Sequence, residues 1–437
     1  MPNFLRLSYY LTGAIRRAYW HPKRLREFQE KRLRYTVRYA YNFVPFYHRR
    51  FRATGVFPDD IKGLDDLKKL PIITKDEYRH IPINELISKE FINYKLRMVQ
   101  TSGSTGKPLK IYLTAAESDW RKAVYMRANM LCGQMPADRW VVITAPHHFG
   151  SVPRLQRSLG IYAQTCLSVF DCMEKHVDFI REFKPQILDG YSGVLLLLAQ
   201  EVKKSGLTFK PKLVFGNADL IDPSSRKNLE EVFNAPYCDQ FGCAEFNRTA
   251  WNCIERQAYH MDVDSTLFEF TDANGDAVSA GECGEIVYTS LFNYAMPFIR
   301  YSVGDLGRPA DDFCSCGITL PLMKVVEGRK DSVIILPNGR LLSPRVFTVA
   351  MSMFRFYSII EQFRVVQKKL DHFEINLKMT NSKVDYELVR RELVEHLIRT
   401  LNVKALDLFF DVRFVDDVPL SKGGKRMAVI SEVAIPQ

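Results

Sequence analysis

Residues 101–108 have the sequence Thr-Ser-Gly-Ser-Thr-Gly-Lys-Pro and combine four hydroxyl groups, two glycines and one ammonium group with little bulk. Glycine lets the backbone adopt positive φ, and successive backbone N–H groups can then form an anion-binding concavity. The strand-loop-helix P-loop needs four residues between its glycines, but two separate Gly103 from Gly106. The segment therefore predicts a different polyphosphate loop, placed between two strands. The alternative is a surface hairpin with a Ser/Gly tip.

Four further segments place charged groups close to glycines, and one of them is residues 328–331 at the domain joint. Glu245 follows a glycine turn at Gly242, and a carboxylate there suits Mg²⁺, which prefers oxygen ligands beside phosphates. Asp305 follows a turn at Gly304 and could accept bonds from two ribose hydroxyl groups. Lys425 lies on a glycine loop from which its ammonium group could reach into a cleft. Each segment alone is more often a simple turn, and only their order and spacing together favour a nucleotide site.

Another group of residues has the side chains that bind zinc. Cys314 and Cys316 form a Cys-x-Cys-Gly knuckle, and Cys253 and His260 precede it in the chain. Three sulfurs and one imidazole make a tetrahedral zinc set, and a reduced, buried cluster is the alternative. Five further cysteines are interpreted as ordinary thiols: Cys132, Cys166, Cys172, Cys238 and Cys283.

The elements that must position these residues predict an α/β protein. Residues 1–95 are expected to be mostly helical, and strands then alternate with helices, which favours a largely parallel sheet. From residue 267 onward, shorter strands with Gly/Asp turns favour antiparallel pairing. A boundary at 328–331 divides a large domain, residues 1–330, from a small α+β domain, residues 331–437. Strands are expected at 140–144, 186–188, 212–215 (closed by Gly216-Asn217), 237–241, 333–336, 363–366, 373–377 and 411–415, and helices at 170–183 and 386–399.

The charge of the chain is unevenly distributed. Residues 1–50 hold twelve Lys/Arg and two Asp/Glu, a net +10 of the total +11. Apolar residues recur at helical spacing in this stretch, so the basic residues are expected on the outer face of a helix. The charge indicates an anionic partner (acidic membrane lipid, a phosphopantetheine carrier or nucleic acid), or else a solvated helix that covers the main domain. No zinc finger or RNA-binding aromatic motif supports nucleic acid.

The rest of the composition is that of an ordinary globular enzyme of 437 residues, long enough for two or three domains. No run of about 18 apolar residues is present, so we expect no membrane span. The first twenty residues lack the layout of a signal peptide. The expected location is the cytoplasm, with peripheral attachment to the inner membrane face as an extension of it.

Taken together, these segments resemble the adenylate-forming superfamily of acyl-CoA synthetases, adenylation domains and luciferases. Within it, the chain is similar to the phenylacetate–CoA ligase branch, including its CapK-type members in capsular-polysaccharide biosynthesis. The resemblance covers nearly the full length and implies a large N-terminal domain with mixed sheets and a small mobile C-terminal α+β domain. It is carried by residues 39–47, 101–108, 241–245, 299–307, 328–344 and 418–425.

The resemblance implies roles for particular residues, with ATP, Mg²⁺ and coenzyme A as cofactors and Zn²⁺ as a structural addition. Glu245 would hold Mg²⁺, Asp305 would bind the ribose with help from Arg329, Asp331 would be the hinge, and Lys425 would bridge the carboxylate and the α-phosphate. The β- and γ-phosphates would be bound by Thr101, Ser102, Gly103, Ser104, Thr105, Gly106 and Lys107. The adenine would be lined by Gly216, Asn217, Ala218, Gln240 and Phe241. The acid is expected at His147, His148, Tyr191 and Gly242.

Apart from Arg426-Met427 after Lys425, which differs from the commoner ending, the chain departs from the branch at three places. Cys243 stands where Ser or Thr is common, Ala218 where Glu is common, and residues 146–150 do not resemble the corresponding stretch of the aromatic-acid ligases. These differences concern the walls of the pocket more than the ATP chemistry. They leave phenylacetate itself in doubt as the substrate.

The sequence thus predicts an AMP-forming ligase that activates a carboxylic acid and transfers the acyl group to a thiol, with coenzyme A as the expected acceptor. Alternative acceptors are an amine or amino sugar in surface-polysaccharide biosynthesis, or a carrier protein. A hypothesis of another class is an inactive nucleotide-binding or scaffold protein, and a basic nucleic-acid binder rests only on residues 1–50. The acid, the acceptor, the oligomeric state and the occupancy of the zinc set stay open at this stage.

Overall fold

The computed structural model describes residues 3–101, 109–149, 152–218, 223–255, 258–272, 274–325, 334–338, 341–342, 344–380, 385–403, 408–418 and 428–433. The chain forms two compact units. Unit 1 contains Met1–Thr101, Lys110–Gln134 and Cys238–Gly328. Unit 2 contains Ser102–Leu109, Met135–Tyr237 and Arg329–Gln437.

Unit 1 begins with helices whose ends are capped by local residues. Asn3 accepts a hydrogen bond from the backbone N–H of Arg6 and caps the first helix, and Pro22 is the first residue of the second. Leu33 is fully buried on the second helix, as its apolar spacing predicts. The elements are α1 (Phe4–Arg17), α2 (Pro22–Phe43), α3 (Pro45–Ala53), η1 (Pro58–Asp60), η2 (Leu64–Lys69), β1 (Ile73–Thr74), α4 (Lys75–His80), α5 (Ile83–Leu86), η3 (Lys89–Phe91) and α6 (Ala115–Leu131).

The sheet of unit 1 is antiparallel, except that β1 joins β13 in parallel. Its strands lie in the order β11-β12-β13-β14-β10-β9-β8. A separate two-stranded hairpin, β2 (Arg97–Gln100) with β3 (Lys110–Leu113), flanks the predicted phosphate loop and confirms the expected strands on both sides of it. The other strands are β8 (Tyr237–Cys243), β9 (Asn247–Asn252), β10 (Tyr259–Met261), β11 (Thr266–Thr271), β12 (Gly284–Ser290), β13 (Tyr301–Ala310) and β14 (Leu322–Val325).

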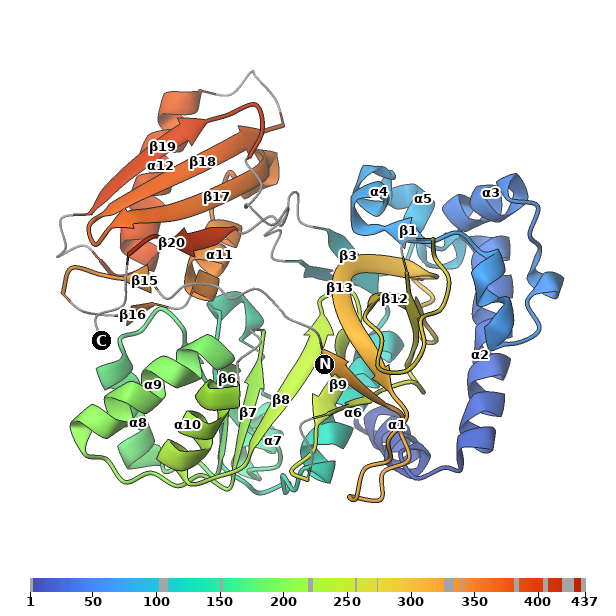
Figure 1. Ribbon diagram of the computed structural model, residues 1–437, viewed down its shortest axis with the longest axis horizontal. Coiled ribbons are helices and arrows are strands. Elements are labelled where there is room, and N and C mark those ends of the chain that lie inside the picture. The colour runs from blue at the N-terminus through green and yellow to red at the C-terminus, as the bar shows by residue number, and fades with distance from the viewer. Residues whose placement is uncertain are drawn as a thin grey trace. The chain divides into compact units, whose positions relative to one another are not determined.

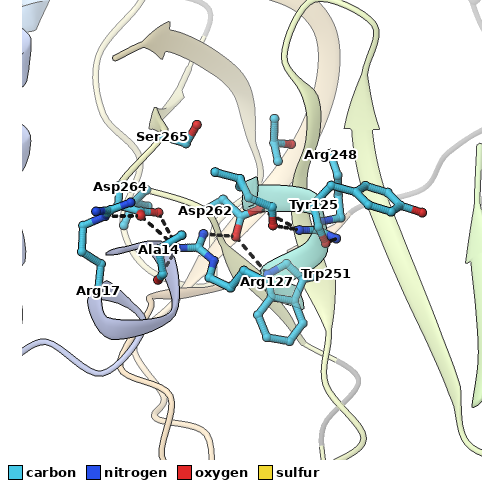
Figure 2. Close-up of polar contacts among 12 residues, drawn as sticks. Ala14, Arg17, Tyr125, Arg127, Arg248, Trp251, Asp262, Asp264 and Ser265 are labelled. Atoms are coloured by element: carbon cyan, nitrogen blue, oxygen red, sulfur yellow. Dashed lines mark hydrogen bonds and ion pairs between the residues drawn. The ribbon is translucent and has the colours of Figure 1, made fainter. Parts of the chain in front are cut away.

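A buried network of charges fastens α1 to the rest of unit 1 (Figure 2). Arg127, from α6, is fully buried and forms ion pairs with Asp262 at 2.5 Å and Asp264 at 2.9 Å. Arg17, at the end of α1, donates from Nε to Asp264 at 2.6 Å, and Arg127 also donates to the carbonyl of Ala14 at 3.1 Å. Burial would raise the pKa of Asp264, but the charges of Arg127 and Arg17 outweigh it and lower that pKa. The last turn of α1 is therefore part of the core and not a loose basic arm.

Four strands of unit 2 pair in parallel in the order β7-β6-β4-β5. Every residue of β6 is buried, as expected for a parallel strand covered on both faces. Helix α9 contacts β6 and β7 and ends at Gly206, whose φ of 66° is accessible to glycine. The elements are β4 (Trp140–Thr144), η4 (Pro146–His148), α7 (Arg154–Ser158), β5 (Gln164–Ser168), α8 (Met173–Phe183), β6 (Ile187–Tyr191), α9 (Ser192–Ser205), β7 (Leu213–Asn217) and α10 (Pro223–Phe233).

The C-terminal part of unit 2 is a smaller α+β region with a sheet of its own, drawn from orange to red in Figure 1. Its strands lie in the order β19-β18-β17-β20, and Phe347, Phe373 and Leu393 are fully buried in its core. The elements are β15 (Ile334–Ile335), β16 (Leu341–Leu342), α11 (Pro344–Ser352), η5 (Tyr357–Ile359), β17 (Ile360–Lys369), β18 (His372–Met379), α12 (Tyr386–Thr400), β19 (Phe409–Phe414) and β20 (Val429–Ser431).

The observed fold confirms the predicted α/β class with a mixed large sheet and a smaller C-terminal α+β region. Three local predictions are wrong or incomplete. Gly216 and Asn217 continue β7 and do not close it, and the expected turn at Gly304 is an irregularity inside the ten-residue strand β13. Helix α11 and strand β20 were not predicted. Among the described helices, none is long and apolar enough to cross a membrane.

Candidate active site

Glu245 is the best-defined functional candidate of unit 1. It follows β8, and its side chain is fully buried. Lys75 Nζ lies 2.9 Å from Glu245 Oε1, and the Tyr301 hydroxyl donates to the same oxygen at 3.1 Å. The other oxygen, Oε2, is buried and has no hydrogen-bond partner among the described residues. A buried carboxylate oxygen with open lone pairs is costly unless something fills the place.

The electrostatics of Glu245 keep it ionised. Burial would raise its pKa, but the charge of Lys75, with the hydrogen bonds from Lys75 and Tyr301, lowers the pKa below its ordinary value. The neighbouring groups are held neutral. Burial raises the pKa of Tyr301 well above its ordinary value, and the charge of Glu245 adds to this. Burial likewise raises the pKa of Cys243, so its thiol stays protonated beside the carboxylate.

Lys75 is a candidate functional residue that the sequence reasoning missed. Strand β1 pairs in parallel with β13, so Thr74 lies opposite Ser302 and the next residue points its chain toward Glu245. Thr74 caps α4 by accepting from the backbone N–H of Glu77 at 3.2 Å. This makes Lys75 the first residue of a helix, where the macrodipole disfavours a positive charge. The sequence signal that could have identified Lys75 was its position directly after a threonine able to cap a helix.

The backbone around Glu245 is fixed by neighbouring side chains. Arg121 donates to the carbonyls of both Ala244 and Glu245, the first at 2.9 Å. Gly242 lies in a tight approach of β8 to β9, because a Cβ there would stand 2.1 Å from the carbonyl oxygen of Asn247. This packing explains the glycine without reference to a substrate, and the role of Gly242 in acid binding stays a prediction.

Asp305 lies in β13 at a place where the pairing of β13 with β12 is irregular. On β12 the register with β13 shifts between Glu285 and Val287, which face Leu306 and Ser302. The extra residues of β13 form a bulge, a device that re-aims side chains at functional sites. Asp305 is half-buried there. Burial, with Asp305 as the largest charge effect, raises the pKa of Tyr288 well above its ordinary value.

Unit 2 holds the predicted adenine segment at the end of β7. Gly216 is required there, since a Cβ would stand 1.8 Å from the Tyr237 hydroxyl. Asn217 donates from its side chain to Asp189 at 2.9 Å, and its carbonyl accepts from Ser192 at 3.1 Å. Ala218 is exposed and has a φ of 69°, in the left-handed region that alanine rarely adopts.

The predicted acid-binding residues of unit 2 gather where β4 and β6 end. The Tyr191 hydroxyl lies 3.4 Å from His148 Nδ1 and 3.4 Å from the Thr144 hydroxyl. Tyr191 is buried and His148 is exposed. The carboxyl ends of parallel strands are the usual ligand edge of an open α/β sheet. His147 lies in η4, and its side chain is outside the described structure.

Several predicted residues lie wholly outside the described residues: Ser102, Gly103, Ser104, Thr105, Gly106, Lys107, Arg329, Asp331 and Lys425. Thr101, just before the loop, is buried. Of the remaining adenine residues, Gln240 donates to the side chain of Asn129 at 3.1 Å, and the ring of Phe241 lies 6.2 Å from that of Tyr259. Their assigned roles stay predictions.

The predicted zinc ligands are brought together in unit 1. The ligand atoms of Cys253, His260, Cys314 and Cys316 all lie within 4.8 Å of one another. The Sγ atoms of Cys253 and Cys314 are 3.4 Å apart, and Cys316 Sγ is 3.5 Å from His260 Nε2. In a tetrahedral zinc site, the known Zn–S and Zn–N lengths give ligand separations of about 3.5–3.8 Å. The residues present therefore fit zinc.

Comparisons with known proteins find similar chains over most of the length. No protein-family model matches the chain. It is 26% identical over 395 residues to phenylacetate-coenzyme A ligase of Thermus thermophilus, covering 85% of this chain and 86% of that protein. The Escherichia coli K12 phenylacetate-coenzyme A ligase is 26% identical over 421 residues, covering 91% and 93%. Protein CapK of Staphylococcus aureus is 23% identical over 436 residues, covering 94% and 91%.

A solved structure of 2-hydroxyisobutyryl-CoA ligase in complex with 2-HIB-AMP and CoA matches with a TM-score of 0.66 and 20% identity, covering 95% of this chain and 92% of that one. The fold is therefore that of an adenylate-forming coenzyme A ligase. The resemblance seen in the sequence is confirmed: over most of its length the chain is similar to phenylacetate–coenzyme A ligases and to CapK.

Proposed function

We propose that the protein is an AMP-forming ligase that activates a carboxylic acid with ATP to an acyl-adenylate and transfers the acyl group to the thiol of coenzyme A. The observation that carries the proposal is the ionised, buried Glu245 with one oxygen left open beside Lys75. Relatives named for this reaction align with most of the chain. The solved relative of the same fold binds an acyl-adenylate and CoA.

The residues present fit a magnesium ion at Glu245. Oε2 is a buried carboxylate oxygen with no partner among the described residues, and hard cations prefer such oxygens. Mg²⁺ would supply charge neutralisation at the phosphates when bound. The protein's own part is to keep Glu245 ionised through Lys75 and to hold its backbone through Arg121. Asp305 would bind the ribose from its bulge.

The remaining roles follow the expected mechanism. A carboxylate that attacks the α-phosphate of ATP meets strong charge repulsion, and Lys425 would offset the charge that develops there. The loop from Thr101 to Lys107 would hold the β- and γ-phosphates. Asp331 would be the hinge between residues 1–330 and 331–437, so that a thiol can replace the Lys425 loop after adenylation.

Zinc is proposed as a structural ion held by Cys253, His260, Cys314 and Cys316. All four positions are filled by protein ligands, so the site leaves no open place for catalysis. The loop after the knuckle is tied to the turn between α1 and α2. Thr319 donates from its backbone to the carbonyl of Ala18 at 2.9 Å and from its hydroxyl to that of Trp20 at 2.6 Å. Bound zinc would thus stabilise the N-terminal helices.

A second acceptor is supported by one specific relative. Protein CapK aligns with 94% of this chain, and the predicted capsule role would require an amine or amino sugar in place of the thiol. Both acceptors share the adenylation half-reaction, so the ATP site is the same. The proposed location is the cytoplasm. The proposed partner of residues 1–50 is an anionic surface or a carrier protein.

The test is acid-dependent exchange of pyrophosphate into ATP over aryl, short acyl, hydroxy, amino and sugar acids. Exchange with at least one acid, lost by about 10²-fold or more in Lys425→Ala, is the expected result. An acid found in this way is then supplied with coenzyme A, with an amino sugar, or with neither. Absence of exchange with every acid, together with retained ATP binding, would instead support the inactive nucleotide-binding protein.

A further inference from the structure

A half-open groove of about 1320 Å³ lies within unit 1 along α1 and α2. None of its lining residues belongs to the predicted ATP, acid or zinc sites. Its walls are aromatic, with rings from Tyr10, Trp20, Phe28, Trp120 and Phe292. Such a surface offers apolar area together with ring faces that attract cations. The groove is therefore a separate candidate binding site.

Positive charge dominates the groove. Its charged lining consists of five arginines and one carboxylate, Glu117. That carboxylate is buried and already accepts from the backbone N–H groups of Thr114, at 2.6 Å, and Ala295, at 2.8 Å. It is not available to neutralise the arginines. The arginines are Arg6, Arg16, Arg17, Arg24 and Arg32.

Two of these arginines keep donors without partners. Arg17 is only 8% exposed, and its Nη2 has no hydrogen-bond partner among the described residues. The same holds for the buried Nε of Arg32. The Arg17 guanidinium lies 4.9 Å from the ring centre of Trp120, and that of Arg32 lies 3.8 Å from the ring of Phe292. These guanidinium groups therefore hold positive charge at the wall of the groove.

The groove is preformed because α1 is fixed at both ends. Arg6 forms an ion pair with the buried Asp119 at 2.5 Å near the start of the helix. Arg17 pairs with Asp264 at its end, as Figure 2 shows. Gly13 gives room for this guanidinium, since a Cβ there would lie 2.9 Å from Arg17 Nη1. Binding would thus require little reordering of the walls.

Large apolar side chains stand exposed around the same helices. Leu5 is 85% exposed and Tyr9 is 76% exposed on α1, and Tyr94 is 66% exposed beside the groove. Exposed tyrosines and basic residues around an apolar helix face are typical of helices that lie in the interface of a membrane. A groove for a small soluble anion would not need this rim.

We propose that this face docks the protein on a bilayer that contains anionic phospholipid. Arg16 and Arg24 attract the headgroup phosphates, Arg17 and Arg32 add positive charge from the groove wall, and Leu5 enters the interface. The proposal is independent of the ligase reaction, because the groove shares no residue with the ATP motifs.

The test is co-sedimentation of the full chain with vesicles of phosphatidylcholine alone or with added phosphatidylglycerol. We expect binding only to the anionic vesicles, with a steep loss as salt rises. Arg16→Glu with Arg24→Glu should weaken binding by more than about 10-fold, since each basic residue near such a surface contributes about 1 kcal/mol. Leu5→Asp should weaken it as well. The matched control is Lys210→Glu with Lys227→Glu, the same charge change at exposed positions of unit 2.

A second readout places the lipid in the groove. Brominated phosphatidylglycerol should quench the fluorescence of Trp20 and Trp120 in the groove, and Trp20→Phe should reduce that quenching. Equal binding to neutral vesicles, an equal loss in the control variant, or binding unchanged in Arg16→Glu with Arg24→Glu would overturn the proposal. Full competition by free glycerol phosphate would show an anion pocket without a bilayer, and retention on duplex DNA without vesicle binding would show a nucleic-acid surface. Pyrophosphate exchange should stay unchanged in all these variants, so a failed docking test leaves the ligase proposal intact.

Discussion

Two buried carboxylate sites of unit 1 differ in how completely they are paired. Asp264 receives Arg127 and Arg17, each within 3.0 Å, and both of its oxygens take part. Glu245 receives Lys75 and Tyr301 on one oxygen, and its other oxygen has no partner among the described residues. The saturated site joins elements that are distant in the sequence. The open site keeps an ionised oxygen available for chemistry.

The kind of cation matters as much as the number of bonds. Arginine presents a rigid fork of donors that suits fixed ion pairs, whereas lysine is a compact charge on a flexible chain. Arg127 is fully buried, while the side chain of Lys75 is 21% exposed. We therefore expect Lys75 to release Glu245 when a ligand binds, and Arg127 to stay paired with Asp264. The comparison predicts a stability site and a function site, and the following variants test that division.

The largest effect is expected from removal of one charge at each site. Asp264→Asn should lower the free energy of unfolding by about 3–5 kcal/mol, because it leaves Arg127 and Arg17 buried without their partner. Glu245→Gln should cost less than about 1 kcal/mol, since Lys75 can turn to solvent, but should lower pyrophosphate exchange by about 10²-fold or more. Denaturant unfolding and the exchange assay, both run on each variant, give the answer. Equal losses of stability at the two positions would remove the distinction.

Lys75→Met should destabilise the protein by about 3 kcal/mol at neutral pH, because it leaves a buried carboxylate unpaired. In the wild type the pKa of Glu245 is lowered, so the pair stabilises above the unfolded pKa of about 4.5 and this stability is lost as the pH falls through the folded value. In the variant burial raises that pKa, and stability is lost as the pH rises. The difference between the two proteins should thus grow from pH 4 to pH 7. Unfolding curves across this range test it, with Lys204→Met, at an exposed pair, as the control.

The zinc set offers a third kind of buried site, in which a metal would saturate the ligands. Protein prepared in metal-free buffer should contain about one zinc per chain, and Cys314→Ser should lose it and more than about 2 kcal/mol of stability. Elemental analysis with thermal unfolding measures both quantities. Cys283→Ser, at an exposed cysteine, should change neither. Protein without zinc that melts as before after Cys314→Ser would show ordinary buried thiols.

The smallest effect is expected at the end of β7 in unit 2. Ala218 has a φ of 69°, so Ala218→Gly should relieve backbone strain and raise stability by about 0.5–1 kcal/mol. If the strained turn shapes the adenine pocket, the same variant should weaken ATP binding measurably by calorimetry. Gly206→Ala, at the capping position of α9, should have the opposite sign on stability. A stabilised variant with unchanged ATP affinity would separate Ala218 from the nucleotide.

The sequence determined the local parts of this protein. Apolar spacing and turn residues predicted both boundaries of β4 correctly. They predicted the first residue of α12 correctly and its last residue one position too early. The strands on both sides of residues 101–108 were predicted as well. The four residues proposed to bind zinc could be chosen because cysteine and histidine have few other roles in such a pattern, and the structure brings them together. The family resemblance fixed the fold class, because it rests on the order of several motifs at once.

Tertiary structure decided which buried carboxylate has partners on both oxygens, as Asp264 does, and which keeps one oxygen unpaired among the described residues, as Glu245 does. Lys75 reaches Glu245 only because β1 pairs with β13, across more than two hundred residues of chain. Arg17 looked like one more surface charge in the basic stretch, and only the packing of α1 on α6 buries it against Asp264. Strand pairing and helix packing are non-local, and a pattern of residue types along the chain does not encode their register. The pairing of charges, and with it the chemistry, is therefore read from the folded chain.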